Sequence, residues 1–277
     1  MKTAIIHLGT HKAASTSIQL FLSHNRDVLR EAGICYPEAP PPTSFAHHGM
    51  AWTIIRRYTG LERRPANFSL EDALAQFADS EADTLFLSSE DFLTTSFYDG
   101  FLDEFFARLR QTFDRIVVCA FVRSRKDFFN SSYNQWVKSL SFSQHFGHYL
   151  NQALSGVQAP MHYTKALSLW GELADETVFL PFLPKTFGAA PELYLLEKLG
   201  VQASVIESLE AFSSAALNAS IGPRAVIAFR RLSHSLHESD WYEHYDLAKR
   251  EMLLYELENW AADNDWNTDK FRAMTPQ

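Results

Sequence analysis

Four short apolar runs constrain the fold more than any other feature of this sequence. They are Thr3–Leu8, Thr84–Ser88, Ile116–Val122 and Thr177–Phe182. Each is close to continuously apolar rather than alternating, as expected when helices cover both faces of a parallel sheet. Helical patterns separate the runs, which predicts βαβ units with right-handed crossovers. The sequence therefore predicts an α/β fold of three layers, with a central, mainly parallel β-sheet flanked by helices.

Apolar stripes and capping residues predict where the helices lie. Ser69 is a plausible N-cap, because acidic residues fill the turn that follows it. The predicted helices are Ser15–Arg30, a segment beginning at Ser69 and running to Phe77, Lys126–Leu140, Pro191–Leu199, Arg224–Leu236 and Tyr242–Trp260. Between Tyr36 and Ser44, four prolines exclude a helix or the interior of a sheet. With no repeat and no clear linker, residues 1–277 are expected to form a single domain.

Composition excludes several classes of function. The net charge of −8 argues against a general nucleic-acid binder, although a local basic pocket remains compatible with it. Neither Cys35 nor Cys119 lies in a CxxC motif, so neither a zinc site nor a redox pair is expected. No apolar stretch approaches the roughly 20 residues that cross a bilayer. The N-terminus lacks a signal-peptide pattern, and the expected location is the cytoplasm.

A candidate phosphate loop follows the first run directly. It reads Gly9-Thr10-His11-Lys12-Ala13-Ala14-Ser15-Thr16-Ser17, and a predicted helix begins within it. Backbone N–H groups at a helix N-terminus, a lysine and several hydroxyls are the groups that bind phosphate. The alternative is that the serines and threonines only cap the helix. Lys12 follows Gly9 by three residues rather than six, so the loop is not a Walker A motif.

A second basic site follows the third run. Arg123 lies where this strand is expected to leave the sheet, at the carboxyl edge where open α/β sheets bind ligands. Ser131 lies eight residues further on, in a predicted helix. An arginine and a hydroxyl suit a phosphate monoester, because a bidentate arginine contact is strong. The alternative is a solvated helix face with Arg123 paired to a carboxylate.

Together the two sites resemble the PAPS-dependent sulfotransferase family, in particular its bacterial and carbohydrate-acting members. In that family a pattern like Lys-x-Gly-Thr-Thr after the first strand holds the 5′-phosphosulfate, and Lys12-Ala13-Ala14-Ser15-Thr16 is similar to it. An arginine followed eight residues later by a serine holds the donor's 3′-phosphate, and Arg123 and Ser131 match in type and spacing. The resemblance covers residues 3 to 200 and fades towards the C-terminus.

The resemblance implies a fold like that of P-loop NTPases and a cofactor, PAPS, that is released as adenosine 3′,5′-bisphosphate. It implies no required metal. The expected cofactor-binding residues are Thr10, Lys12, Ala13, Ala14, Ser15, Thr16, Ser17, Arg123 and Ser131. Two positions depart from the family: Ala14 replaces the usual glycine, and Arg125 replaces a frequent proline. The Arg-Lys-Gly element of cytosolic hormone and phenol sulfotransferases is absent near the C-terminus.

The expected catalytic residues are Lys12, His48 and Glu90. Lys12 would neutralise the charge that develops on the departing phosphate. Glu90 follows the second run at the carboxyl edge, and family members often use a glutamate or histidine as base. His48 follows the proline-rich stretch, and an ordinary histidine titrates near neutrality. Which of the two is the base stays open, with Asp91 as a further candidate, and either could instead be structural.

The sequence thus predicts an enzyme that moves a sulfuryl group from PAPS to a hydroxyl or amine, with a small-molecule or glycan acceptor. One alternative is a P-loop-type kinase or NTPase, which would need an acidic metal ligand such as Glu90 or Asp91. Another is a non-catalytic binding module on the same fold. Neither the identity of the acceptor nor the oligomeric state follows from the sequence.

Overall fold

The computed structural model describes residues 1–10, 13–42, 44–60, 65–138, 142–155, 163–183 and 190–210, together with 226, 229 and 230. The chain divides into two compact units. The first comprises Met1–Ser124 and Val157–Ser214, and the second comprises Arg125–Gly156 and Ala215–Gln277. The expectation that residues 1–277 form a single domain stays a prediction.

The first unit is built on a five-stranded, entirely parallel sheet. Its strands lie in the order β2-β3-β1-β4-β5. They are β1 (Thr3–Leu8), β2 (Ile34–Cys35), β3 (Thr84–Ser89), β4 (Arg115–Val122) and β5 (Glu176–Pro181). The four predicted strands are confirmed within a residue at either end. The two-residue β2 was not predicted, because it is too short to form an apolar run.

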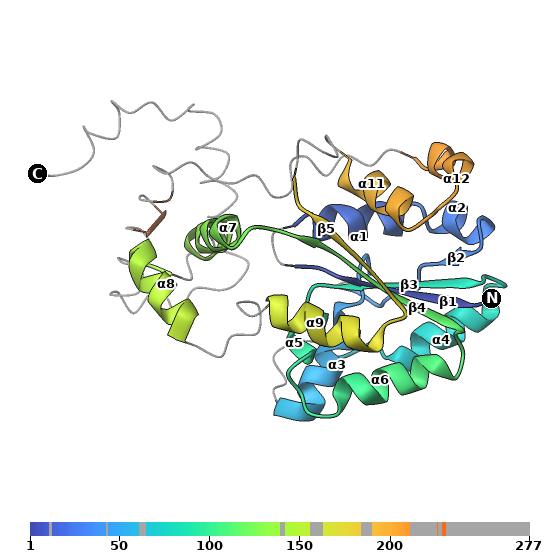
Figure 1. The fold of residues 1–277 in the computed structure, drawn as a ribbon, viewed down its shortest axis with the longest axis horizontal. Coiled ribbons are helices and arrows are strands. Elements are labelled where there is room, and N and C mark those ends of the chain that lie inside the picture. The colour runs from blue at the N-terminus through green and yellow to red at the C-terminus, as the bar shows by residue number, and fades with distance from the viewer. Residues whose placement is uncertain are drawn as a thin grey trace, which may run out of the picture. The chain divides into compact units, whose positions relative to one another are not determined.

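Helices cover both faces of this sheet, which gives the predicted three layers (Figure 1). One face carries α1 (Ser15–His24), α2 (Arg26–Glu31), α11 (Pro191–Lys198) and α12 (Ala203–Ser208). The other carries α3 (His48–Thr59), α4 (Leu70–Asp79), α5 (Phe92–Thr95), α6 (Phe101–Arg110) and α9 (Tyr163–Leu173). The predicted N-cap of α4 is confirmed, since the Ser69 hydroxyl accepts a hydrogen bond from the backbone N–H of Asp72.

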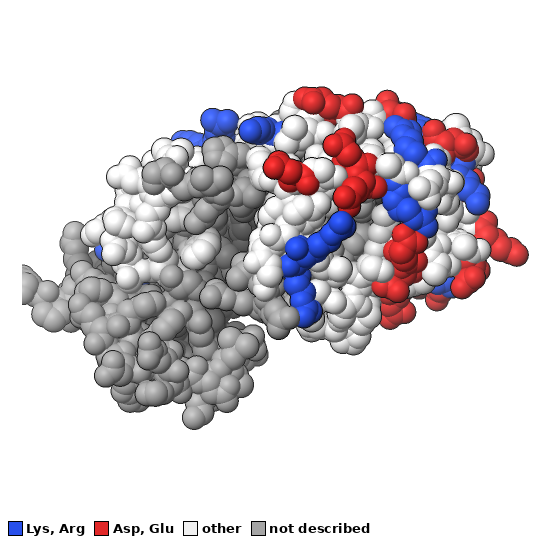
Figure 2. Space-filling model, turned by 90° about the horizontal axis from the view of Figure 1, so that it is seen from below, with Lys and Arg blue, Asp and Glu red and all other residues white. Residues whose placement is uncertain are grey.

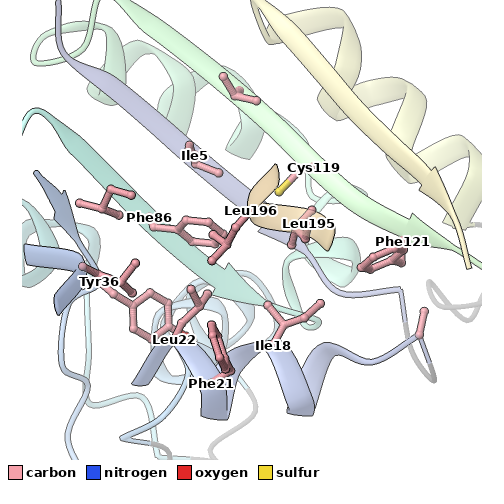
Figure 3. Packing of buried hydrophobic residues seen from close by; sticks show 14 residues of the cluster. Ile5, Ile18, Phe21, Leu22, Tyr36, Phe86, Cys119, Phe121, Leu195 and Leu196 are labelled. Atoms are coloured by element: carbon pink, nitrogen blue, oxygen red, sulfur yellow. The ribbon is translucent and has the colours of Figure 1, made fainter. Parts of the chain in front are cut away.

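An apolar cluster fills most of the space between the sheet and α1 (Figure 3), where the buried Gln19 of α1 also donates to the Ser88 hydroxyl at 3.2 Å. Ile18, Phe21 and Leu22 project from α1 onto the strands. They meet Ile5, Phe86, Cys119 and Phe121 from the sheet, and Leu195 and Leu196 from α11. The side chain of Cys119 is fully buried, and this burial raises the pKa of its thiol far above the ordinary range. It serves as a small core hydrophobe, as predicted.

An aromatic cluster fills the opposite layer. Trp170 of α9 is fully buried and lies within 6.0 Å, ring centroid to ring centroid, of Phe92, Phe105 and Phe106. Its indole N–H donates a hydrogen bond to the Ser96 hydroxyl at 2.9 Å, so the one polar atom of this ring has a partner. These aromatic contacts pack α5, α6 and α9 against one another on the face of the sheet that also carries α3.

The predicted helix Ser15–Arg30 is in fact two helices that meet at Asn25. The side-chain amide of Asn25 donates to the carbonyls of Phe21 and Glu210, and its oxygen accepts from the backbone N–H of Glu210. Asn25 is buried, so these bonds replace hydration that its amide loses. The break depends on a contact between residues 185 positions apart, which no local pattern encodes.

The second unit contributes α7 (Arg125–Lys138) and α8 (Phe146–Ser155). α7 corresponds to the predicted helix Lys126–Leu140. Tyr133 of α7 lies 5.2 Å from Phe146 and 5.5 Å from Tyr149 of α8, centroid to centroid, so aromatic contacts hold the two helices together. The predicted helices Arg224–Leu236 and Tyr242–Trp260 lie outside the described residues, apart from three helical positions in the first of them.

The described helices include none that is both long and apolar enough to span a bilayer. On the face of the molecule seen in Figure 2, the described surface carries basic and acidic side chains next to one another. Arg57 pairs with Glu104 at 3.0 Å and Arg108 pairs with Glu71 at 2.7 Å, joining α3, α4 and α6 across their exposed sides.

Two histidines of the first unit are completely buried. His7 on β1 contacts the Ser88 hydroxyl through Nδ1 at 2.8 Å. His47 donates through Nε2–H to the Pro37 carbonyl at 2.9 Å and accepts the backbone N–H of Ser88 at Nδ1, also at 2.9 Å. Burial lowers the pKa of each to about 4; a nearby Glu90 carboxylate opposes the shift at His7. Both rings are therefore neutral in the folded protein near pH 7.

We predict that acid destabilises the protein between about pH 6.5 and pH 4. In this window the unfolded chain protonates both histidines and the folded chain does not, so stability falls as the pH falls. Each histidine contributes up to about 1.4 kcal/mol per pH unit. Urea unfolding across this range should show a shallower pH dependence for His7→Gln than for the natural sequence. His148→Gln, at an exposed position, serves as the control; equal slopes for His7→Gln and the natural sequence would contradict the prediction.

Candidate active site

Three strand ends meet at one edge of the sheet. Leu8 of β1 is in register with Ser89 of β3, so these two strands end level with each other. β4 pairs with β1 through Cys119 and His7 and runs on to Val122 at the same edge. β1 continues into α1 on one face, whereas β3 continues into α5 on the other (Figure 1). Neighbouring strands whose chains turn to opposite faces leave a crevice at their carboxyl ends, where ligands of open α/β sheets bind.

The loop after β1 packs tightly against the end of β3. A Cβ added at Gly9 would lie 2.8 Å from the Cβ of Glu90 and 2.9 Å from the Cβ of Ser15. Contacts this short do not occur between real carbon atoms, so only glycine fits here. Gly9 thus lets the loop turn back over the sheet edge and brings the start of α1 next to Glu90.

Ala14 takes the backbone conformation that glycine ordinarily supplies. It is the N-cap of α1 and has φ 63° and ψ 12°, in the left-handed region. An alanine there costs about 1–2 kcal/mol relative to an ordinary backbone conformation. Ala14 thus adopts a backbone conformation that favours glycine, at the position where the sequence departs from the family pattern.

Ser15 presents a buried hydroxyl at the helix start. The residue is 3% exposed, and its Oγ has no hydrogen-bond partner among the described residues. Burying a hydroxyl without a partner costs about 1–3 kcal/mol. It lies beside the first N–H groups of a ten-residue helix, which have no partners within the helix. The loop therefore offers unsatisfied donors together, as an anion site requires.

Other predicted loop residues make internal contacts. Thr10 is buried, and its hydroxyl donates to the backbone carbonyl of Phe121 near the end of β4. Ser17 donates to Oε2 of Glu192 at 3.1 Å, which ties α1 to α11; burial raises the pKa of Glu192. Ala13 is buried and its N–H donates to the carbonyl of Thr10, while Thr16 is half-buried. Lys12 lies outside the described residues, as does His11.

Arg123 follows β4 at the same edge. Its guanidinium carbon lies 5.5 Å from the centroid of Phe182, the residue after β5, and its backbone carbonyl accepts the Tyr163 hydroxyl at 2.8 Å. The aromatic ring and this hydrogen bond hold the residue at the sheet edge. Ser131 belongs to α7 in the second unit and is buried there. The predicted pairing of Arg123 with Ser131 stays a prediction.

His48 begins α3 and faces the end of β3. Its Nδ1 lies 3.0 Å from the Ser89 hydroxyl and 3.4 Å from Oδ2 of Asp91. The same Asp91 oxygen accepts the indole N–H of Trp52 at 2.7 Å. The His48 and Asp91 side chains are only 11% and 13% exposed, so this pair is largely shielded from water. A carboxylate facing one ring nitrogen is the arrangement that prepares the other nitrogen to accept a proton.

Glu90 lies between the loop and the buried histidine of β1. It is half-buried, its Cβ packs against Gly9, and its charge partly offsets the burial that lowers the pKa of His7. The structure therefore brings Glu90, the loop after β1 and Arg123 to one sheet edge, and places His48 against the same strand end through Ser89.

Sequence reasoning missed Ser89 and Trp52 as members of this site. Both could have been found: Ser89 is the last residue of a buried strand at the ligand edge, and Trp52 follows His48 by four residues, one helical turn on the same face. Among the residues that the structure describes, no group of three or more His, Cys, Asp and Glu side chains could hold a metal ion.

We predict that Gly9→Ala destabilises the protein, by about 1–3 kcal/mol, because the added methyl group overlaps Glu90 and Ser15. Chemical denaturation measures the loss. Gly147→Ala is the control, since it adds the same methyl group to a helix at a position with nothing within 4 Å. Equal stability of the two variants would show that the loop does not approach β3 as closely as described.

Comparison with protein-family models and with curated proteins finds no match. Solved structures do match. A sulfotransferase from Alicyclobacillus acidocaldarius is 15% identical over 91% of this chain and 99% of its own, with a TM-score of 0.49. Retinol dehydratase in complex with androsterone and the inactive cofactor PAP is 14% identical over 97% of this chain and 82% of its own, with a TM-score of 0.36. The chain is thus similar, at low sequence identity, to the solved structures of a sulfotransferase and of a retinol dehydratase.

Proposed function

We propose that this protein is a PAPS-dependent sulfotransferase that moves a sulfuryl group to a hydroxyl or amine. The observation that carries the proposal is the loop after β1. Gly9 allows the close approach to β3, Ala14 adopts a left-handed backbone conformation, and Ser15 offers a buried hydroxyl without a partner among the described residues. This cradle suits an anionic group at the start of α1, and it coincides with the segment that resembles the family's 5′-phosphosulfate motif.

PAPS, when bound, supplies the activated sulfuryl group. The groups proposed to hold its 5′ end are the backbone N–H groups from Ala14 to Thr16, the Ser15 and Thr16 hydroxyls, and Lys12, with Ala13 as part of the loop that positions them. Thr10 and Ser17 support this loop indirectly, because their hydroxyls bond to Phe121 and Glu192. Lys12 is proposed to stabilise the negative charge that grows on the phosphate as the sulfuryl group leaves.

Arg123 and Ser131 are proposed to bind the 3′-phosphate. Arg123 lies at the same carboxyl edge as the loop, because β1 and β4 are paired in register and Thr10 bonds to Phe121, two residues before the arginine. A guanidinium can grip a phosphate with two parallel hydrogen bonds, which makes Arg123 the stronger of the two contacts.

His48 is proposed as the general base and Glu90 as the residue that orients Lys12 or the acceptor. His48 lies in a largely dry site with a carboxylate at Nδ1, whereas Glu90 packs against the loop backbone. A base in this position accepts the acceptor's proton as the new bond to sulfur forms. The expected acceptor is a small molecule or a glycan, and the expected location is the cytoplasm.

We predict that Arg123→Ala weakens binding of adenosine 3′,5′-bisphosphate roughly ten- to hundredfold. A charge-assisted hydrogen bond contributes about 1.5–3 kcal/mol, and each 1.4 kcal/mol is about a tenfold change in affinity. Isothermal titration calorimetry measures the dissociation constant without the need for an acceptor.

Arg57→Ala is the matched control for this experiment. It removes the same charge from α3, where Arg57 is exposed and pairs with Glu104. Its affinity for the nucleotide should equal that of the natural sequence. Failure of the unchanged protein to bind adenosine 3′,5′-bisphosphate at all would overturn the proposed function.

We also predict that His48→Ala slows sulfuryl transfer by about 10²–10⁴-fold, the usual contribution of a general base. Release of adenosine 3′,5′-bisphosphate from PAPS is followed with a panel of sugar, phenol and amine acceptors. Nucleotide affinity should stay unchanged, because the variant alters the acceptor side only. His24→Ala, an exposed histidine at the end of α1, is the control and should transfer at the rate of the natural sequence.

A further inference from the structure

Packing holds the His48 ring in one orientation. Trp52 stacks on it with the ring centroids 5.7 Å apart and the planes 16° apart. Phe45 meets it edge-on at 6.4 Å and 79°. With two aromatic neighbours and little exposure, the imidazole cannot turn over without displacing a ring. Which of its two ring nitrogens carries the proton therefore depends on the groups that each nitrogen faces.

Nδ1 faces two oxygen atoms. The nearer, Oγ of Ser89 at 3.0 Å, already accepts the backbone N–H of Asp91 at 3.2 Å. The other, Oδ2 of Asp91 at 3.4 Å, belongs to a carboxylate, which can only accept hydrogen bonds. The carboxylate charge at this distance attracts an N–H at Nδ1 and repels a lone pair there. Within the described part of the chain, Nε2 has no hydrogen-bond partner of its own.

Trp52 fixes the carboxylate as well as the ring. Its indole N–H donates to Oδ2 of Asp91 at 2.7 Å, and its ring stacks on the imidazole. One side chain thus sets the positions of both members of the His48–Asp91 pair. The spacing of four residues between His48 and Trp52 on α3 places them one above the other, which makes this possible.

We infer that Asp91 is a positioning residue, held by Trp52, that keeps the proton of neutral His48 on Nδ1 and leaves the lone pair on Nε2. The inference deepens the proposed function and rests on it for its chemical meaning. As the acceptor oxygen bonds to sulfur, its proton passes to Nε2, and the bond between sulfur and the phosphate oxygen breaks with its electron pair going to the phosphate. The resulting imidazolium faces the Asp91 carboxylate, which stabilises its charge.

His47, the preceding residue, carries its proton on the other ring nitrogen, Nε2. Its Nε2–H donates to Pro37 and its Nδ1 accepts the backbone N–H of Ser88, so both nitrogens are engaged inside the protein. Adjacent histidines therefore differ in tautomer, one protonated at Nε2 and structural, the other protonated at Nδ1. This gives any experiment on His48 an internal reference in the same molecule.

Nitrogen-15 NMR of the histidine side chains tests the inference, since it distinguishes a protonated from an unprotonated ring nitrogen. Signals are assigned by His48→Gln and His47→Gln, and spectra are recorded with the rings neutral. We expect Nδ1–H at His48 and Nε2–H at His47. Asp91→Ala should convert most of His48 to Nε2–H, because Ser89 then donates to Nδ1, while Asp91→Asn, whose amide oxygen can replace the carboxylate oxygen, should largely retain Nδ1–H.

Two further variants complete the test. Trp52→Phe keeps a stacking ring but lacks the indole N–H, and it should raise the Nε2–H fraction of His48. Asp99→Ala removes one negative charge at an exposed position eight residues from Asp91 and should leave the His48 signals unchanged. Calorimetry with adenosine 3′,5′-bisphosphate checks that each variant retains its binding site.

The outcomes separate this inference from the proposed function. Nε2–H at His48 in the unchanged protein, or an unaltered tautomer in Asp91→Ala, overturns the inference whatever the activity. If the tautomers behave as expected, the positioning role of Asp91 is supported even where His48→Ala retains transfer activity. That second result would remove His48 as the base and would count against the proposed function alone.

Discussion

The site depends on hydrogen bonding on both sides of β1. Because this strand is paired in parallel with β3 along one side and β4 along the other, the carboxyl ends of all three lie at the same edge of the sheet, with β4 extending furthest. Gly9 then lets the loop after β1 pass close enough to β3 to bring Ser15 beside Glu90. A shift of a single residue in either pairing would move every side chain of that strand to the other face of the sheet. The positions of the side chains at this edge of the sheet therefore depend first on the register of the strands, and only then on the identity of any single residue.

Most of the sheet could be predicted from the sequence because strands buried on both faces need long apolar stretches, and helices on both sides need apolar stripes. Those signals are local. β2 escaped prediction since two residues cannot form such a stretch, and the break between α1 and α2 escaped because Asn25 is held by Glu210, far away in the chain. The N-cap Ser69 was predictable for the opposite reason: its partner, Asp72, lies within one helical turn.

The same contrast between local sequence signals and long-range contacts applies to the candidate site. The loop at Gly9–Ser17, Arg123 and Glu90 were recognised from their positions after apolar runs. The left-handed conformation of Ala14 was not, because alanine gives no local sign of it. The cluster around His48 required α3 to be placed against the end of β3, and the distances from Nδ1 to Ser89 and Asp91 depend on that tertiary packing. Likewise, the bond from Ser17 to Glu192 joins residues 175 positions apart, so this structural contact of a predicted ligand-binding residue could not be read from local sequence.

The hydrogen bond from Thr10 to Phe121 connects two parts of the candidate site, the loop after β1 and the end of β4. Thr10 lies at the start of the loop, and Phe121 is two residues before Arg123, so the loop backbone and the end of β4 share a buried connection. Neither segment can shift by more than a fraction of a hydrogen-bond length without pulling the other or breaking a bond that water cannot replace. A displacement of the loop is thereby passed to the end of β4 through a single hydroxyl group, which couples the position of Arg123 to that of Thr10.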